Sequence, residues 1–142
     1  MKIPLTKGFL LDVERDTATF TVIRKNFHII TRAIVDTGSP FTILMENDLK
    51  RTRIPYTQLP KIQKVNLGPI AIFLIDLGDC DLLFRDVDNN QITLKHKIYG
   101  GVIAQRNLQI IQILPSILGR DFLVKYNFDI KRDEEGNVYL QT

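Results

Sequence analysis

The chain has 142 residues, a length that favours one domain over residues 1–142, and its net charge of +3 is scattered along the sequence. The lone Cys80 excludes an intrachain disulfide and a cysteine-based zinc site, so we expect a reducing, cytoplasmic location. No run approaches 18 apolar residues and the first eight residues lack an apolar core, so we expect neither a membrane span nor a signal peptide.

The N-terminal half of the sequence predicts short β-strands. Their β-branched and apolar residues recur in short runs bounded by polar or turn-forming residues. The runs lie at 17–23, 27–30, 32–35 and 41–44. Residues 46–51 are the first plausible helical turn, and Pro55 and Pro60 forbid regular helix beyond it.

The C-terminal half continues the β pattern. The runs lie at 61–66, 70–77, 80–84 and 91–98. Residues 108–114 alternate Gln with aliphatic side chains, which predicts a further strand that ends at Pro115. One short helix follows Gly119, and a final hairpin joins 128–130 to 138–140. These many short strands favour an all-β barrel or sandwich.

An acidic residue, Asp36, directly follows the apolar strand residues Ala33–Val35. A carboxylate in that position is costly unless it has hydrogen-bond partners. Thr37 and Ser39 place two hydroxyls beside it, and Gly38 lets the backbone turn so that its N–H points at the carboxylate. The local pattern predicts a half-buried acid in a tight turn.

A second distinctive segment lies near the C-terminus. Two large aliphatic residues, Ile117 and Leu118, precede Gly119, which would let a neighbouring strand pass very close. Arg120 and Asp121 then open a short helix, where Asp121 suits the positive end of the helix dipole.

Together these two segments resemble the retropepsin-like aspartic proteases. The matching residues are Ile34–Ser39 and Pro115–Leu123, and the resemblance spans about residues 17–130. It implies an all-β closed barrel with a flap hairpin and one short C-terminal helix. Because Asp16-Thr17 is followed by Ala18, the chain has a single Asp-Thr-Gly motif. The resemblance therefore implies a homodimer with its site on the two-fold axis.

For this family the implied activity is that of an aspartic endopeptidase, with Asp36 from each of two subunits as the dyad. Two facing carboxylates cannot both ionise, so the pair shares one proton and activates a water without metal or cofactor. By resemblance, Thr37 would brace the partner subunit's loop, and Gly38 would present its carbonyl to the substrate backbone. Ser39 would hydrogen-bond the outer carboxylate oxygen of Asp36.

The resemblance also implies a flap that closes over an extended peptide or protein substrate. Chain order places this hairpin at Ile62–Ile72, with substrate-binding residues at the tip Leu67-Gly68-Pro69-Ile70. Gly100-Gly101 is a rival position for the tip. Retroviral members carry an acid that pairs with the arginine of the second motif, whereas this chain has Pro40 there, which leaves the partner of Arg120 open.

Two other functions stay open. The domain could be a catalytically silent module that binds extended peptides or serves in dimerisation. The basic segment 50–53 could contact nucleic acid, but we expect a solvated face there and no nucleic-acid partner. We also expect His28 and His96 at the surface of strands, and Cys80 as a thiol without a catalytic role.

Overall fold

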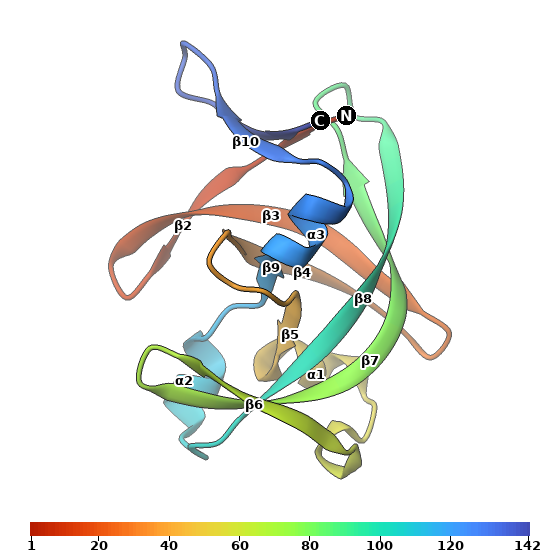
Figure 1. Cartoon of the computed structure of the whole chain (residues 1–142), viewed down its shortest axis with the longest axis vertical. Helices are drawn as coiled ribbons and strands as arrows, with labels where there is room; N and C mark the ends of the chain where they lie inside the picture. The colour runs from red at the N-terminus through yellow and green to blue at the C-terminus, as the bar shows by residue number, and fades with distance from the viewer.

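The computed structural model covers all 142 residues and consists mainly of β-strands (Figure 1). An eight-stranded sheet has the order β2-β3-β4-β9-β5-β8-β7-β6, and a three-stranded sheet has the order β1-β11-β10. The strands are β1 (Lys2–Pro4), β2 (Thr6–Leu10), β3 (Val13–Arg24), β4 (Phe27–Asp36), β5 (Ile43–Met45), β6 (Lys61–Leu67), β7 (Ile70–Arg85), β8 (Gln91–Ile103), β9 (Ile117–Gly119), β10 (Asp129–Arg132) and β11 (Val138–Gln141). The helices are α1 (Glu46–Thr52), the 3-10 turn η1 (Tyr56–Gln58), α2 (Leu108–Ile113) and α3 (Arg120–Lys125).

The large sheet bends back on itself without forming the closed barrel that the resemblance implied. Two of its inner strands, β3 and β7, meet and pair, from Thr21 opposite Leu83 to Ile23 opposite Asp81. The end strands β2 and β6 do not pair with each other. Each belongs to a hairpin, β2–β3 or β6–β7, that extends beyond the β3–β7 pairing (Figure 1). The outer edges of β2 and β6 therefore stay free.

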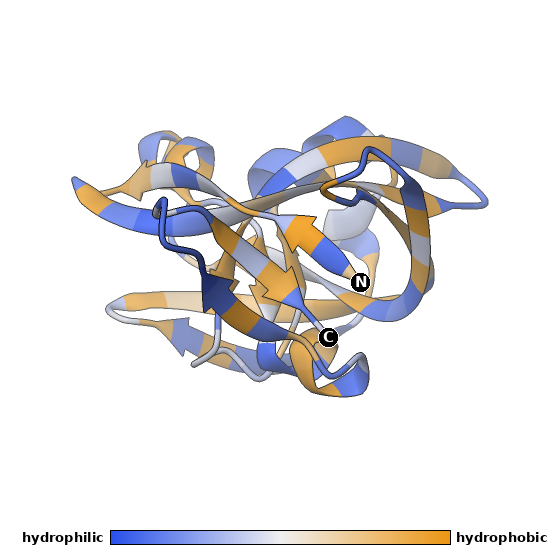
Figure 2. Cartoon of the chain, turned by 90° about the horizontal axis from the view of Figure 1, so that it is seen from above, coloured by the Kyte–Doolittle hydropathy of each residue, from blue (hydrophilic) through white to orange (hydrophobic).

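The main core follows the period-2 alternation of the strands. In β4 the alternate residues Phe27, Ile29, Thr31 and Ala33 are buried while the residues between them are exposed, and Figure 2 shows the same alternation of hydropathy along the long strands. The ring of Phe122 in α3 packs against Phe84, with ring centroids 5.5 Å apart. This contact fixes α3, and the motif that opens it, against the sheet.

A second, smaller core packs α2 against the base of the β6–β7 hairpin. It contains Ile111 and Leu114 together with side chains from β5, β7, β8 and β9. The segment 108–113 is therefore a helix, and the strand predicted there is wrong. The side chain of Asn107 caps it by accepting a hydrogen bond from Gln109 N at 3.0 Å. The residues Ile110, Ile111 and Leu114 also fit a helical face, which explains the misassignment.

The two glycines proposed as a rival flap tip lie inside β8. A Cβ atom on Gly100 would come within 2.7 Å of Ile75, and one on Gly101 within 2.8 Å of Ile43. Their role is to let β7 and β5 pack closely against β8, so the rival position for the tip is wrong. The run predicted as two strands over 70–84 is one bent strand, β7, with a register shift between Asp76 and Gly78. Each of the helices is too short to span a membrane.

Candidate active site

The two motifs of the sequence lie side by side in the fold. Strand β4 ends at Asp36 and runs parallel to β9, with Ile34 opposite Ile117 and Asp36 opposite Gly119. The backbone N–H of Ile34 also donates to Ser116 O at 2.9 Å. Segments about 80 residues apart in the chain therefore meet at the acidic residue.

The turn after Asp36 has the geometry that the sequence predicted, with one exception. The N–H of Gly38 donates to Asp36 Oδ1 at 2.9 Å, and the N–H of Ser39 donates to Asp36 O at 3.2 Å. A Cβ on Gly38 would lie 3.3 Å from Asp36 Oδ1. The expected bond from the Ser39 hydroxyl to Asp36 is wrong, because Ser39 Oγ donates to Phe41 O at 2.8 Å and is buried.

Gly119 is the point where the second motif crosses the chain that follows Asp36. A Cβ placed on Gly119 would lie 2.2 Å from the backbone oxygen of Phe41. No side chain fits there, because a backbone atom cannot move aside as a flexible side chain can. The N–H of Arg120 donates to Ser39 O at 2.7 Å beside this crossing. The close approach predicted from the glycine is confirmed.

Asp121 anchors the crossing through side chains. Its carboxylate accepts from Thr42 Oγ1 at 2.7 Å, from Thr42 N at 3.2 Å and from His96 Nε2 at 2.9 Å. Burial raises the pKa of Asp121, but the hydrogen bonds from His96 and Thr42 outweigh it, and the net pKa lies below its usual value. His96 is buried, so its expected place at the surface is wrong, whereas His28 is exposed.

The guanidinium of Arg120 has no carboxylate partner within the chain. The side chain is exposed and takes part in none of the ion pairs of the structure. Pro40, at the position of the retroviral acid, is exposed as well. In this chain the anchoring role therefore lies with Asp121, Thr42 and His96, and Arg120 is left at the surface.

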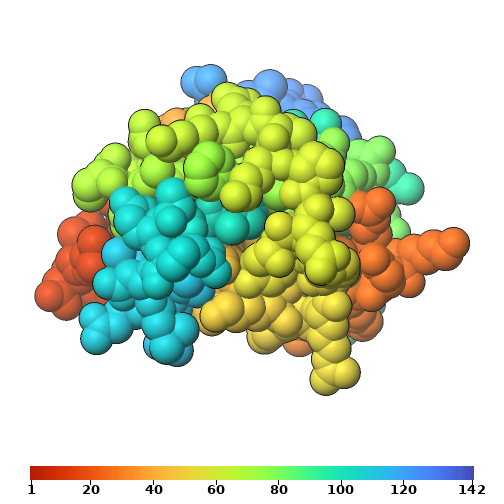
Figure 3. All heavy atoms as spheres, turned by 90° about the horizontal axis from the view of Figure 1, so that it is seen from below, coloured from red at the N-terminus to blue at the C-terminus, as the bar shows by residue number.

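A cavity of about 340 Å³ separates Asp36 from the tip of the β6–β7 hairpin. One side is formed by Ile34, Val35 and Asp36 of β4, with Leu114, Pro115 and Ile117 beside them. The tip residues Leu67, Gly68, Pro69 and Ile70 form the opposite side, and Leu10, Leu11 and Arg15 come from the β2–β3 hairpin. Figure 3 shows these three parts together, with the red β2–β3 tip beside the yellow-green hairpin and the cyan α2 segment.

The cavity brings Asp36 together with the predicted tip residues Leu67–Ile70, whereas Thr37, Gly38 and Ser39 do not line it. Gly68, with φ at +57°, occupies the left-handed region that a tight hairpin turn requires, and Pro69 follows it. Thr37 and Gly38 are exposed just beyond the cavity. The cavity's mostly apolar lining suits a large aliphatic or aromatic side chain.

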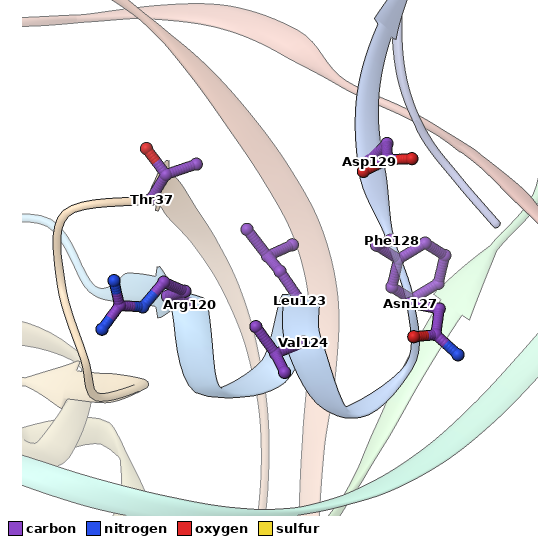
Figure 4. A pocket seen from close by; sticks show the side chains of 7 residues that line it. All are labelled: Thr37, Arg120, Leu123, Val124, Asn127, Phe128 and Asp129. Carbon is purple, nitrogen blue, oxygen red and sulfur yellow. The ribbon is translucent and has the colours of Figure 1, made fainter.

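A second hollow, of about 430 Å³, lies on the other side of the Asp36 turn. Figure 4 shows Thr37 and Arg120 at one end, Asp129 at the other and the helix residues Leu123 and Val124 between them. This hollow is open to solvent, and Asp36 does not line it. The candidate catalytic chemistry therefore belongs to the cavity with Asp36, and this hollow is a surface beside it.

Sequence reasoning missed several residues of the site. Leu11 and Arg15 come from a hairpin that was not predicted before residue 17. His96 shares the face of the buried Ile98, and this alternation was a usable signal. Thr42 carried no signal in the sequence, because its partners lie 77 and 79 residues away. The thiol of Cys80 is buried, and burial raises its pKa to about 11, which suits a structural rather than a nucleophilic residue.

No protein-family model and no curated protein sequence matches the chain. Among solved structures, the chain is similar to a retropepsin-like aspartic protease from Rickettsia conorii, with a TM-score of 0.57 and 16% identity over 99% of this chain and 88% of that one. It also matches the retroviral protease-like domain of Ddi1 from Leishmania major, with a TM-score of 0.46 and 13% identity over 89% and 93% of the two chains. A third match is EIAV protease in complex with an inhibitor, with a TM-score of 0.39 and 16% identity over 84% and 94%. The chain has a retropepsin-like fold.

Proposed function

We propose that the protein is an aspartic endopeptidase that works as a homodimer, with Asp36 of each copy forming the catalytic dyad. One observation carries the proposal: Asp36 ends β4 opposite Gly119 and lies across a cavity from a hairpin tip. Hydrolysis of a peptide bond in an extended substrate needs an acid, an apolar pocket for a side chain and a hairpin that closes over the peptide. The retropepsin-like fold supports the same activity by analogy.

The chemistry follows from two carboxylates that share one proton. The ionised Asp36 accepts a proton from a water molecule, and the resulting nucleophile attacks the scissile carbonyl carbon. The protonated Asp36 of the other copy donates its proton to the carbonyl oxygen. The tetrahedral intermediate then collapses as the leaving nitrogen is protonated, so no covalent bond to the enzyme forms. The N–H of Gly38 donates to Asp36 Oδ1 and so holds one carboxylate in place.

The neighbouring residues serve binding rather than proton transfer. Gly38 is exposed after the catalytic turn, where its carbonyl accepts from the substrate backbone in this proposal. Thr37, also exposed, braces the turn of the second copy through its hydroxyl. The hairpin tip at Gly68 and Pro69 closes over the peptide, which lies extended beneath it.

The proposal is tested by substituting the acid without changing its size. Asp36→Asn lowers the rate of cleavage of an unfolded protein substrate about 10²–10⁴-fold, because an amide can neither accept nor donate the shared proton. Asp16→Asn is the matched control, since Asp16 also precedes a threonine but lies outside the cavity, and it keeps full activity. The readout is peptide release from acid to neutral pH, with and without pepstatin.

Pepstatin-sensitive cleavage that only Asp36→Asn removes supports the enzyme. Peptide binding that survives Asp36→Asn, with no cleavage at any pH, identifies a silent peptide-binding module and contradicts the proposal. Steeply salt-dependent binding of DNA or RNA, in the absence of cleavage, would instead favour the basic segment 50–53 as the functional surface.

A further inference from the structure

The cavity that contains Asp36 also contains one positively charged side chain. Arg15 of β3 lines the cavity from the side of the β2–β3 hairpin, together with Leu10 and Leu11. Asp36 and Arg15 are the only charged residues of the lining, and all the others are aliphatic residues, glycine or proline. Arg15 therefore gives one side of an apolar cavity a charge that the proposed cleavage chemistry does not use.

The guanidinium of Arg15 has no carboxylate partner within the chain. Arg15 is exposed and takes part in none of the ion pairs of the structure, so it is not paired with Asp36 either. The neighbouring acids Glu14 and Asp16 point to the opposite face of the hairpin, because successive side chains of a strand alternate. Glu14 is also taken up by Lys7, with Nζ 2.5 Å from Oε1. The charge of Arg15 is therefore uncompensated.

A second arginine adds to the positive charge on this face of the hairpin. Gly8 of β2 lies opposite Arg15 and has no side chain that could cover it. A Cβ atom on Gly8 would lie 3.6 Å from Arg32 Nη2, so the Arg32 guanidinium lies over this glycine. Arg32 Nε donates to the neutral Thr17 Oγ1 at 3.0 Å, and Arg32 takes part in no ion pair. Two uncompensated cations on one face attract an anion.

The surroundings of Arg15 indicate which anion fits. A planar guanidinium binds a carboxylate through two parallel N–H···O hydrogen bonds. Leu10 and Leu11 line the cavity on the same side and offer apolar surface to methylene groups. A glutamate side chain combines two methylene groups with a carboxylate, whereas aspartate has only one. The hairpin tip Leu67–Ile70 forms the opposite side, and its closure would exclude water and strengthen the ion pair.

We propose that Arg15 determines specificity by binding the carboxylate of a glutamate side chain in the substrate. This rests on the proposed function, because selective cleavage requires the cleavage itself. In an extended peptide alternate side chains point to the same side. A glutamate two positions from a large aliphatic residue can therefore enter the cavity with it, the carboxylate at Arg15 and the aliphatic side chain against the apolar lining. The preferred substrates are extended segments that contain this pair.

The test compares the cleavage of short peptides with blocked ends. The peptides consist of Ala, Leu and Phe and carry Glu, Gln or Lys at one position at a time. The wild type cleaves the best Glu peptide with a kcat/KM about tenfold above that of its Gln counterpart, because the carboxylate accepts charge-assisted hydrogen bonds. Arg15→Gln removes this difference, and Arg15→Glu reverses it in favour of the Lys peptide. Lys25→Glu, exposed in the β3–β4 turn and outside the cavity, is the control and keeps the preference.

Binding to the Asp36→Asn chain measures recognition without cleavage. In titration calorimetry this chain binds the Glu peptide about tenfold more tightly than the Gln peptide, and adding Arg15→Gln makes the two dissociation constants equal. A peptide's C-terminus is the other source of a carboxylate. The Gln peptide is therefore also measured with a free C-terminus, and it binds no more tightly than the blocked form.

The outcomes separate this proposal from the proposed function. Cleavage that depends on Asp36 but is equal for Glu and Gln peptides, or a preference unchanged by Arg15→Gln, rejects the role of Arg15 and leaves the activity standing. Glu-selective binding that depends on Arg15, without cleavage, keeps this role and rejects the activity. Equal binding of all peptides, or tighter binding of the free C-terminus, overturns the proposal. If Arg15→Glu does not fold, the loss of preference in Arg15→Gln decides the question.

Discussion

At the scale of single residues, Thr42 holds the two motifs together. Its hydroxyl donates to Asp121 Oδ1 at 2.7 Å and accepts from Gly119 N at 3.1 Å, and its backbone N–H donates to Asp121 Oδ2. The side chain of Thr42 is buried, so its hydroxyl has no water as an alternative partner. Thr42 thus fixes Gly119, and through the β4–β9 pairing it fixes Asp36.

Replacing Thr42 by Val keeps its shape and removes the hydroxyl. The buried N–H of Gly119 and one oxygen of Asp121 lose a partner, so we expect a loss of about 1–3 kcal/mol in the free energy of unfolding. Thr42→Ser keeps the hydroxyl and loses less. Urea unfolding of the three proteins measures this, and equal stability of Thr42→Val and the wild type would contradict it.

Asp121 makes stability depend on pH in acid. Because its folded-state pKa lies below the usual value, the carboxylate stabilises the fold above about pH 4 and loses this effect as the pH falls further. The pKa of the buried Glu46 is also lowered: burial raises it, but hydrogen bonds from Arg106, Ile103 and Tyr56 outweigh that. Both carboxylates therefore weaken the fold when they are protonated.

The substitution Asp121→Asn removes one of these titrations. We expect lower stability than wild type at pH 7, because the amide cannot accept from both Thr42 and His96. We also expect a smaller further loss between pH 5 and pH 3. Urea midpoints at several pH values provide the measurement. A variant whose midpoint falls in acid as steeply as that of the wild type would show that Asp121 does not titrate as described.

At the scale of elements, the β2–β3 hairpin carries an unusual turn. Its two central residues, Leu11 and Asp12, have φ of 50° and 63°, a left-handed pair in which Asn and Gly are favoured. A leucine in this conformation costs about 1–2 kcal/mol. Leu11 is 72% exposed and gains little from burial, yet it lines the cavity that contains Asp36. This position suits substrate binding better than folding.

Leu11→Asn separates these two roles. We expect the variant to be more stable by about 0.5–1 kcal/mol, because Asn tolerates the left-handed turn. We also expect weaker cleavage of substrates that present a large aliphatic side chain to the cavity, seen mainly as a higher KM. Urea unfolding and peptide kinetics test the two effects. Lower stability, or unchanged KM values, would contradict this account of Leu11.

The sequence alone predicted those elements whose turn residues and side-chain alternation lie within the element itself. The hairpin at 129–141 and the strand ending at Asp36 follow from turn residues and alternation in the sequence itself. The helix at 108–113 was missed, because its apolar residues satisfy both periods and its Asn107 cap was not weighed. The β2–β3 hairpin was missed because Leu11 breaks the usual turn signal. For the helix, the packing of Ile111 and Leu114 in the second core decides between the two periods.

At the scale of the whole molecule, the sequence predicted the fold and the central acid but not the sheet closure. Asp36, Gly119 and the hairpin tip were assigned from two motifs and chain order. The structure places Gly119 opposite Asp36 and sets Asp36 in one cavity with the hairpin tip. The partners of Asp121 depend on contacts between distant segments, which spacing alone does not reveal. The sheet stays open because its end strands β2 and β6 do not pair with each other. The β3–β7 pairing that joins its middle links segments far apart in the chain, which local patterns do not reveal.

The single acid per chain gives the account its central claim: each copy holds half of a catalytic site. Subunit mixing tests this most directly. A fixed amount of wild-type chain is allowed to exchange subunits with about a ninefold excess of Asp36→Asn chains. Its cleavage rate is compared with that of the same amount of wild-type chain mixed with an unrelated protein. If two Asp36 residues are needed, mixed dimers are inactive and cleavage falls about tenfold. Cleavage that stays unchanged by the variant would show that one chain carries a complete site and would contradict the claim.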